Sequence, residues 1–218
     1  MTDEATDGSD GATVEIGSEI ASLAGSERAL RIALLEHEPV DPTDPSRLPD
    51  WTVGHVLTHL ARNADSMRSM LDRAPQYPHG RDGRNADIEA GADRSWDELV
   101  DDVVATSELL EQRMAQHDDW SGTVQTITAD RPTTMVPIMR QREVEVHRVD
   151  LGLGYEFADM PAEYVRRDLR MLEMLWKARA PMGMTPLPTA VLAVPPAERL
   201  SWMMGRSDID GVAPAGLF

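Results

Sequence analysis

The sequence contains no cysteine. Disulfide bonds, thiolate ligands for zinc and a cysteine nucleophile are therefore excluded. Any thiol chemistry in this protein requires a thiol from a small molecule. Long apolar runs are missing as well: none approaches the roughly 18–20 residues of a membrane span. Residues 1–12 are acidic and polar, without the charged-then-apolar order of a signal peptide. We expect them to form a disordered tail on a cytoplasmic protein with no membrane partner.

Basic residues are scarce relative to acidic ones. The chain has 21 Lys and Arg against 38 Asp and Glu, which gives a formal net charge of -17 at pH 7. Proteins that bind nucleic acids usually carry a basic patch, so this balance argues against a nucleic-acid partner. A local anion site built from a few arginines stays compatible with it.

A length of 218 residues suits one large domain, or a main domain with a smaller appendage. Apolar residues recur with helical spacing over most of the chain. Glycine, proline, asparagine and arginine dominate residues 75–93, which favours a long loop there. Alternation of β-branched and polar residues predicts a short strand or extended loop at 122–129, and 189–195 is the best strand candidate. The predicted helices span about 13–37, 52–74, 95–117, 134–153, 159–180 and 197–204.

Two of the predicted helices carry candidate metal ligands. Positions i and i+4 share one face of a helix. His55 and His59 have this spacing in one helix, and Glu143 and His147 have it in another. Two imidazoles and one carboxylate form a usual ligand set for a zinc ion that keeps one position open. The sequence therefore indicates a metal site formed by two helices that turn these faces towards each other.

Each half of this pattern also has an ordinary interpretation. A histidine in an amphipathic helix is more often a surface or core residue than a ligand. The segment from Glu143 to His147 also alternates with period two, so it could be a strand. We favour a helix, because Met139, Glu143, Val146 and His147 fall on one helical stripe and Gly152 supplies a stop.

The two motifs together resemble a known family. The stretch W-T-V-G-H-V-L-T-H-L-A-R-N-A-D, from Trp51 to Asp65, and the later R-Q-R-E-V-E-V-H-R-V-D-L-G are similar to the mycothiol-dependent maleylpyruvate isomerase family. That family is a branch of the DinB-like metal-binding four-helix bundles. The resemblance implies a mainly α fold with a short C-terminal α/β appendage. Residues 13–154 would form the bundle, and 155–218 a shortened C-terminal α/β segment.

The resemblance also implies roles for individual residues. The metal ligands would be His59, Glu143 and His147, with His55 as the competing choice for the first. The segment M-M-G-R-S-D-I-D-G resembles the part of the family that carries a substrate-site arginine, which would be Arg206. The cofactors implied are a divalent metal, with zinc favoured, and mycothiol as thiol cosubstrate.

Other residues are weaker candidates or have expected structural roles. Asn63 lies one turn after His59, and Asp150 one turn after His147, so both are candidates for binding the cosubstrate. Asp150 could instead accept a hydrogen bond from a ligand histidine, or be an ordinary acid at a helix end. Arg140 and Arg142 are expected to be solvated surface charges, or alternatively contacts for a substrate anion. Trp51 is expected to be a packing anchor.

Three functions follow from the resemblance and stay open. The first is a maleylpyruvate-type isomerase, in which a thiolate adds to a cis double bond, the new single bond rotates and elimination gives the trans product. The second is a mycothiol S-transferase that acts on electrophiles in detoxification. The third is a non-enzymatic, metal-binding regulatory bundle. The expected partners of an enzyme are a small-molecule thiol and a carboxylate-bearing electrophile, and the chain would be a monomer or a homodimer.

Overall fold

The structure is a computed structural model that describes residues 8–180, 182 and 184–217. The first seven residues of the expected acidic tail lie outside this range, and helix α1 begins at Gly8. The chain groups into two compact units that divide between Leu153 and Gly154. None of the helices in the described part of the chain has the length and apolar character needed to cross a membrane.

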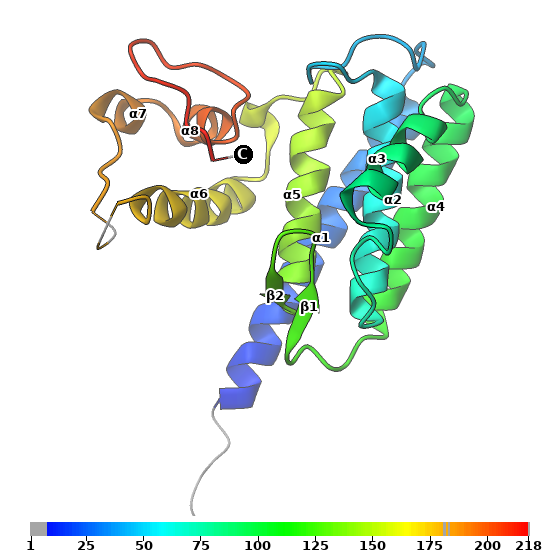
Figure 1. The fold of residues 1–218 in the computed structure, drawn as a ribbon, viewed down its shortest axis with the longest axis horizontal. Coiled ribbons are helices and arrows are strands. Elements are labelled where there is room, and N and C mark those ends of the chain that lie inside the picture. The colour runs from blue at the N-terminus through cyan, green and yellow to red at the C-terminus, as the bar shows by residue number, and fades with distance from the viewer. Residues whose placement is uncertain (1–7, 181, 183, 218) are drawn as a thin grey trace, which may run out of the picture. The chain divides into compact units, whose positions relative to one another are not determined.

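Four long helices form the first unit (Figure 1). They are α1 (Gly8–Glu36), α2 (Val53–Leu71), α4 (Trp96–Ala115) and α5 (Met135–Asp150). Helix α2 packs against α4 and α5, and α1 packs against the same two helices, so the four enclose a common interior. This arrangement confirms the prediction of a mainly α protein built on a four-helix bundle.

The starts of α2 and α4 follow from local sequence. Thr52 accepts a hydrogen bond from the backbone N–H of His55, and the His55 ring accepts one from the backbone of Thr52. Ser95 and Glu98 form the equivalent reciprocal pair at the start of α4. Such pairs satisfy backbone N–H groups that lack partners within the helix. They fix where α2 begins, and so where its histidines lie.

The prediction of a loop over residues 75–93 is wrong. Residues Gly80–Gly91 form helix α3, which packs on α2. Ile88 is the one buried residue of this helix. A helix that buries so little has no apolar stripe for periodicity to detect. Between α4 and α5, strands β1 (Thr123–Gln125) and β2 (Asp130–Pro132) form a short antiparallel hairpin, which confirms the strand alternative for the first of them.

The second unit is helical in its described residues. It contains the 3-10 turn η1 (Phe157–Asp159) and helices α6 (Ala162–Lys177), α7 (Thr189–Ala193) and α8 (Pro196–Met203). The strand predicted at 189–195 is therefore wrong, because these residues form α7 between prolines. A strand needs a neighbour for its backbone hydrogen bonds, and residues 154–180, 182 and 184–217 contain no other strand. Helices α6 and α8 pack together around the buried Tyr164, Leu172 and Trp202.

A layer of buried polar side chains crosses the bundle between two apolar core clusters. Leu30 and Leu60 belong to the cluster on one side of this layer, and Leu23 and Ala64 to the cluster on the other. Buried polar groups are costly unless they are hydrogen-bonded. Thr106 donates to backbone carbonyls of its own helix, and the other members of the layer are hydrogen-bonded to one another. The layer comprises Ser26 and Glu27 of α1, Asn63 of α2, Thr106 and Ser107 of α4, and Arg140, Gln141 and Glu145 of α5.

Arg140 corrects a prediction from the sequence. It is neither a surface charge nor exposed to a substrate, because its side chain is fully buried. Its Nε donates to Oε1 of Glu27 over 2.7 Å, and its Nη1 donates to the carbonyl of Leu60 and to Oδ1 of Asn63. The carboxylate that allows this burial comes from α1, more than a hundred positions away, so no local pattern reveals it.

Candidate metal centre

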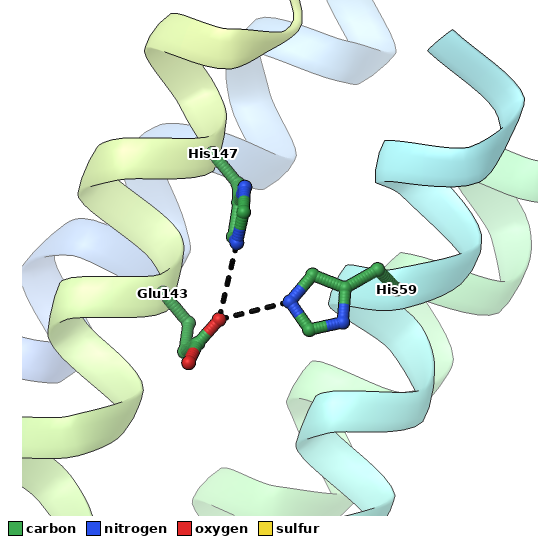
Figure 2. Close-up of side chains that lie close together, drawn as sticks. All are labelled: His59, Glu143 and His147. Atoms are coloured by element: carbon green, nitrogen blue, oxygen red, sulfur yellow. Dashed lines mark hydrogen bonds and ion pairs between the residues drawn. The ribbon is translucent and has the colours of Figure 1, made fainter. Parts of the chain in front are cut away.

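His59 of α2 and Glu143 and His147 of α5 point towards one another (Figure 2). Oε2 of Glu143 lies 2.9 Å from Nε2 of His59 and 3.2 Å from Nε2 of His147. The two imidazole rings are perpendicular, with centroids 4.6 Å apart. One ligand atom from each residue lies within 4.8 Å of the other two. The structure therefore brings together the three residues that the sequence motifs indicate.

The helical geometry of α5 explains this convergence. Glu143 and His147 lie on the same face because α5 is helical from Met135 to Asp150, which rules out the alternative that this segment is a strand. Helices α2 and α5 pack against each other, so the face of α2 that carries His59 meets them. Two local spacings and one helix–helix contact thus place all three side chains.

The cluster is closed on one side and open on another. The side chain of His59 is 3% exposed and that of His147 is 13% exposed, whereas that of Glu143 is 31% exposed. The imidazoles are thus held within the bundle, and the carboxylate lies at its boundary with solvent.

The environment shifts the pKa values of all three groups. Burial is the main influence on His59 and lowers its pKa to about 4. For Glu143, burial alone would raise the pKa, but hydrogen bonds with His147 and His59 hold it well below its ordinary value. Burial would lower the pKa of His147, but its contacts with Asp150 and Glu143 raise it instead. At neutral pH the cluster thus contains a carboxylate and a neutral His59.

The donor set suits a divalent metal ion. Imidazole nitrogens and carboxylate oxygens bind zinc at about 2.0–2.2 Å, so neighbouring ligand atoms of a tetrahedral site lie about 3.3 Å apart. The separations of 2.9 and 3.2 Å at Oε2 of Glu143 are close to this value. Three protein ligands with one side open match the usual composition of a reactive rather than a structural site.

Asp150 lies directly behind His147. Its Oδ2 is 2.9 Å from Nδ1 of His147, on the side of the ring away from Glu143, and its side chain is fully buried. A carboxylate in this position fixes the orientation of a ligating imidazole and increases its basicity. The geometry favours this role over an ordinary helix-end acid, and it leaves a direct contact of Asp150 with the cosubstrate as a prediction.

His55 points away from the cluster. Its Nδ1 lies 2.8 Å from Oγ1 of Thr52, and its Nε2 lies 3.2 Å from Oε2 of Glu89 on α3. These contacts place it in the cap of α2 and in the attachment of α3. The structure thus groups His59, and not His55, with Glu143 and His147.

Asn63 lies in the polar layer of the bundle. It is 1% exposed, and its Oδ1 accepts from Arg140. This contact gives Asn63 a structural role, and binding of the cosubstrate by Asn63 stays a prediction. Arg206 belongs to the second unit, where it follows Gly205 at the end of α8 and donates from Nη1 to the carbonyl of Met204. Its role at a substrate site also stays a prediction.

Two residues at the cluster were not identified as site residues from the sequence. Arg84 of α3 lies with Nη2 3.1 Å from Nδ1 of His59. Trp51, expected to be a packing anchor, has its ring centroid 5.4 Å from that of His59 and 6.4 Å from that of His147. Trp51 does pack against the apolar core, and it also borders the cluster. The segment around Arg84 has no motif or apolar stripe that would have indicated its position.

Comparisons with known proteins agree with this geometry. A family model described as "Mycothiol maleylpyruvate isomerase N-terminal domain" matches residues 23–152. The chain is similar to a solved structure described as the mycothiol-dependent maleylpyruvate isomerase, with a TM-score of 0.76 and 21% identity over 88% of this chain and 90% of that one. A mutant of that isomerase, with one histidine replaced by alanine, gives a TM-score of 0.75 and 20% identity over the same shares. No curated protein sequence matches the chain.

Proposed function

The chain belongs to the mycothiol maleylpyruvate isomerase N-terminal domain family, and from this premise we propose that it is a metal- and mycothiol-dependent isomerase of the maleylpyruvate type. The observation that carries the proposal is the convergence of His59, Glu143 and His147 on one open-sided cluster. The lack of cysteine is consistent with it, because the nucleophile would come from the cosubstrate.

We assign the metal ligands as Nε2 of His59, Oε2 of Glu143 and Nε2 of His147, and zinc is the metal that this donor set favours. A divalent metal held by these residues would lower the pKa of a thiol, so that a thiolate would be available near neutral pH. Asp150 holds the His147 ring in position, and the buried bundle keeps His59 neutral. The protein thus supplies a fixed, partly enclosed place for a thiol beside an open approach.

The reaction needs no net change in the thiol. The thiolate sulfur forms a bond to one carbon of the cis double bond, and the electron pair of that double bond moves onto the conjugated carbonyl. The remaining single bond rotates, the carbonyl electrons return, and the carbon–sulfur bond breaks to give the trans product and the thiolate. Residues that bind the carboxylates of the electrophile would hold it while the bond rotates, and the resemblance of the segment around Arg206 makes that arginine a candidate.

Metal analysis followed by a thiol-dependent assay tests this function. We expect about one divalent metal per chain and turnover of maleylpyruvate that requires mycothiol without consuming it. Consumption of one thiol per product would favour the S-transferase alternative. Stoichiometric metal without turnover by any thiol would favour a regulatory bundle. A protein that stays metal-free after expression with zinc, and binds none on titration, would exclude the proposed site. A reduced thiol cosubstrate also suits a cytoplasmic protein.

A further inference from the structure

Arg84 is the cation closest to the candidate metal centre on α3. Its Nη2 lies 3.1 Å from Nδ1 of His59, and its Nη1 donates to Oδ1 of the neighbouring Asn85 over 3.0 Å. Its guanidinium carbon lies 5.8 Å from the centroid of the Trp51 ring and 5.9 Å from that of Tyr77. Within the described residues, no carboxylate lies close enough to Arg84 to form an ion pair. Neutral partners alone thus hold this charge beside the cluster.

In the contact between Arg84 and His59, the arginine donates the hydrogen bond, whereas a metal-bound histidine needs a partner that accepts one. A guanidinium only donates hydrogen bonds, so Nδ1 of His59 has to accept. An imidazole that binds a metal through Nε2 carries its proton on Nδ1, and that N–H requires an acceptor. At His147, the carboxylate of Asp150 lies 2.9 Å from Nδ1. Arg84 cannot serve His59 in this way, so its donors are suited to a different acceptor at the same place.

The surroundings of Arg84 favour an anionic acceptor. Two aromatic rings lie within the distance over which a ring attracts a guanidinium, and they limit where the planar group can go. Helix α3, which carries Arg84, packs on α2, and the contact of His55 with Glu89 adds a link between the two helices. A guanidinium held in this way binds a carboxylate through two parallel hydrogen bonds.

We propose that Arg84 binds a carboxylate group of the electrophilic substrate beside the metal centre. This inference rests on the proposed function for the identity of the substrate, but the anion site itself follows from the position of Arg84. A carboxylate held there would lie within reach of a thiol bound at the cluster.

Binding of maleate to the zinc-loaded protein tests the proposal without any turnover. Calorimetric titration would compare the wild type with Arg84→Ala and Arg84→Lys. The matched control is Arg81→Ala, which removes the same charge from an exposed position on the same helix. A lost hydrogen bond to a charged group is worth about 1.5–3 kcal/mol, so the maleate Kd of Arg84→Ala should rise roughly ten- to a hundred-fold. Arg84→Lys should lose less, and Arg81→Ala should match the wild type.

Zinc stoichiometry and binding of an uncharged thiol, 2-mercaptoethanol, should be the same in Arg84→Ala and the wild type. Unchanged maleate affinity in Arg84→Ala would overturn the proposal, and so would a wild type that binds no maleate. Loss of zinc in Arg84→Ala would also overturn it, because Arg84 would then be a structural support of the metal site. Maleate binding that depends on Arg84, in a protein without thiol-dependent turnover, would contradict the proposed function and leave the anion site intact.

Discussion

Nε of Arg140 lies 2.7 Å from Oε1 of Glu27, and both side chains are completely buried in the middle of the bundle. Ser107 donates to the other oxygen of Glu27, and Asn63 accepts from Arg140. This pair links α1 to α5 one turn before the metal-site residue Glu143. It therefore connects the stability of the bundle to the placement of the site.

Removal of one member of this pair should destabilise the protein strongly. In Arg140→Met, Glu27 would remain as a buried charge without its partner, which typically costs about 3–5 kcal/mol. Urea unfolding followed by circular dichroism would measure the loss. The double variant Glu27→Leu/Arg140→Met leaves no unpaired charge, so it should recover most of the stability. A loss below about 1 kcal/mol in Arg140→Met would show that the pair contributes little.

Substitution of individual histidines should distinguish the metal ligands from the histidine that caps helix α2. His59→Ala and His147→Ala should each abolish most metal binding, because each removes one nitrogen of a three-residue set. His55→Ala should keep it, since the ring of His55 contacts Thr52 and Glu89 instead. Zinc content after dialysis would be measured for the three variants. Retention of metal in His59→Ala together with its loss in His55→Ala would show that the ligand had been assigned to the wrong residue.

Asp150→Asn should weaken metal binding without removing it. The carboxylate that contacts Nδ1 of His147 is replaced by an amide of nearly the same shape, and loss of such a partner typically costs ten- to a hundred-fold in metal affinity. Competition with a chromophoric chelator would measure the change. Asp65→Asn, which alters a half-exposed carboxylate on α2, is the control and should bind zinc as the wild type does. Equal zinc affinity in both variants would show that Asp150 does not support His147 as a ligand and is an ordinary acid at the end of the helix.

Metal affinity should fall as the pH is lowered, and His147 should set where the fall begins. Contacts with Asp150 and Glu143 raise the pKa of His147 above 6.5, so below that raised pKa a proton has to leave before the metal binds. The affinity should then drop by about tenfold for each pH unit. His59 adds to this only near its pKa of about 4.

Chelator competition between about pH 8 and pH 5.5 covers the range in which His147 should titrate. In Asp150→Asn the fall should begin at a lower pH, because one of the contacts that raise the pKa of His147 is weakened. An affinity that is constant over this range would contradict protonation of His147 as the competing reaction.

Arg206→Ala and Arg206→Lys should keep the metal and the fold but lower kcat/KM. A guanidinium binds a carboxylate through two hydrogen bonds that lysine cannot reproduce. A lost contact to a charged group is worth roughly 1.5–3 kcal/mol, which corresponds to about ten- to a hundred-fold. Steady-state kinetics with an electrophile that the wild type converts would measure the effect. Unchanged kcat/KM in both variants would show that Arg206 does not bind the substrate and serves only at the end of α8.

Much of this architecture could be predicted from local patterns. Apolar stripes indicated all four bundle helices, and the local capping pairs at Thr52 and Ser95 account for where two of them start. The spacing of Glu143 and His147 placed both on one face of a helix. These features depend on residues within one or two turns of each other, and such neighbours are adjacent in the sequence. The predictions of a loop at 75–93 and of a strand at 189–195 were wrong. Short helices with one buried side chain have almost no periodic pattern of apolar residues.

The sequence by itself determined which side chains share a helical face, that two such faces carry metal-binding groups, and that any thiol must come from outside the chain. The tertiary structure alone decided which faces meet. It turned His59 towards Glu143 and His55 towards Glu89, it buried Arg140 against Glu27, and it placed Arg84 beside His59. Each of these contacts joins different helices. Their geometry depends on how whole helices pack against one another, and residues many turns apart leave no local pattern that records it.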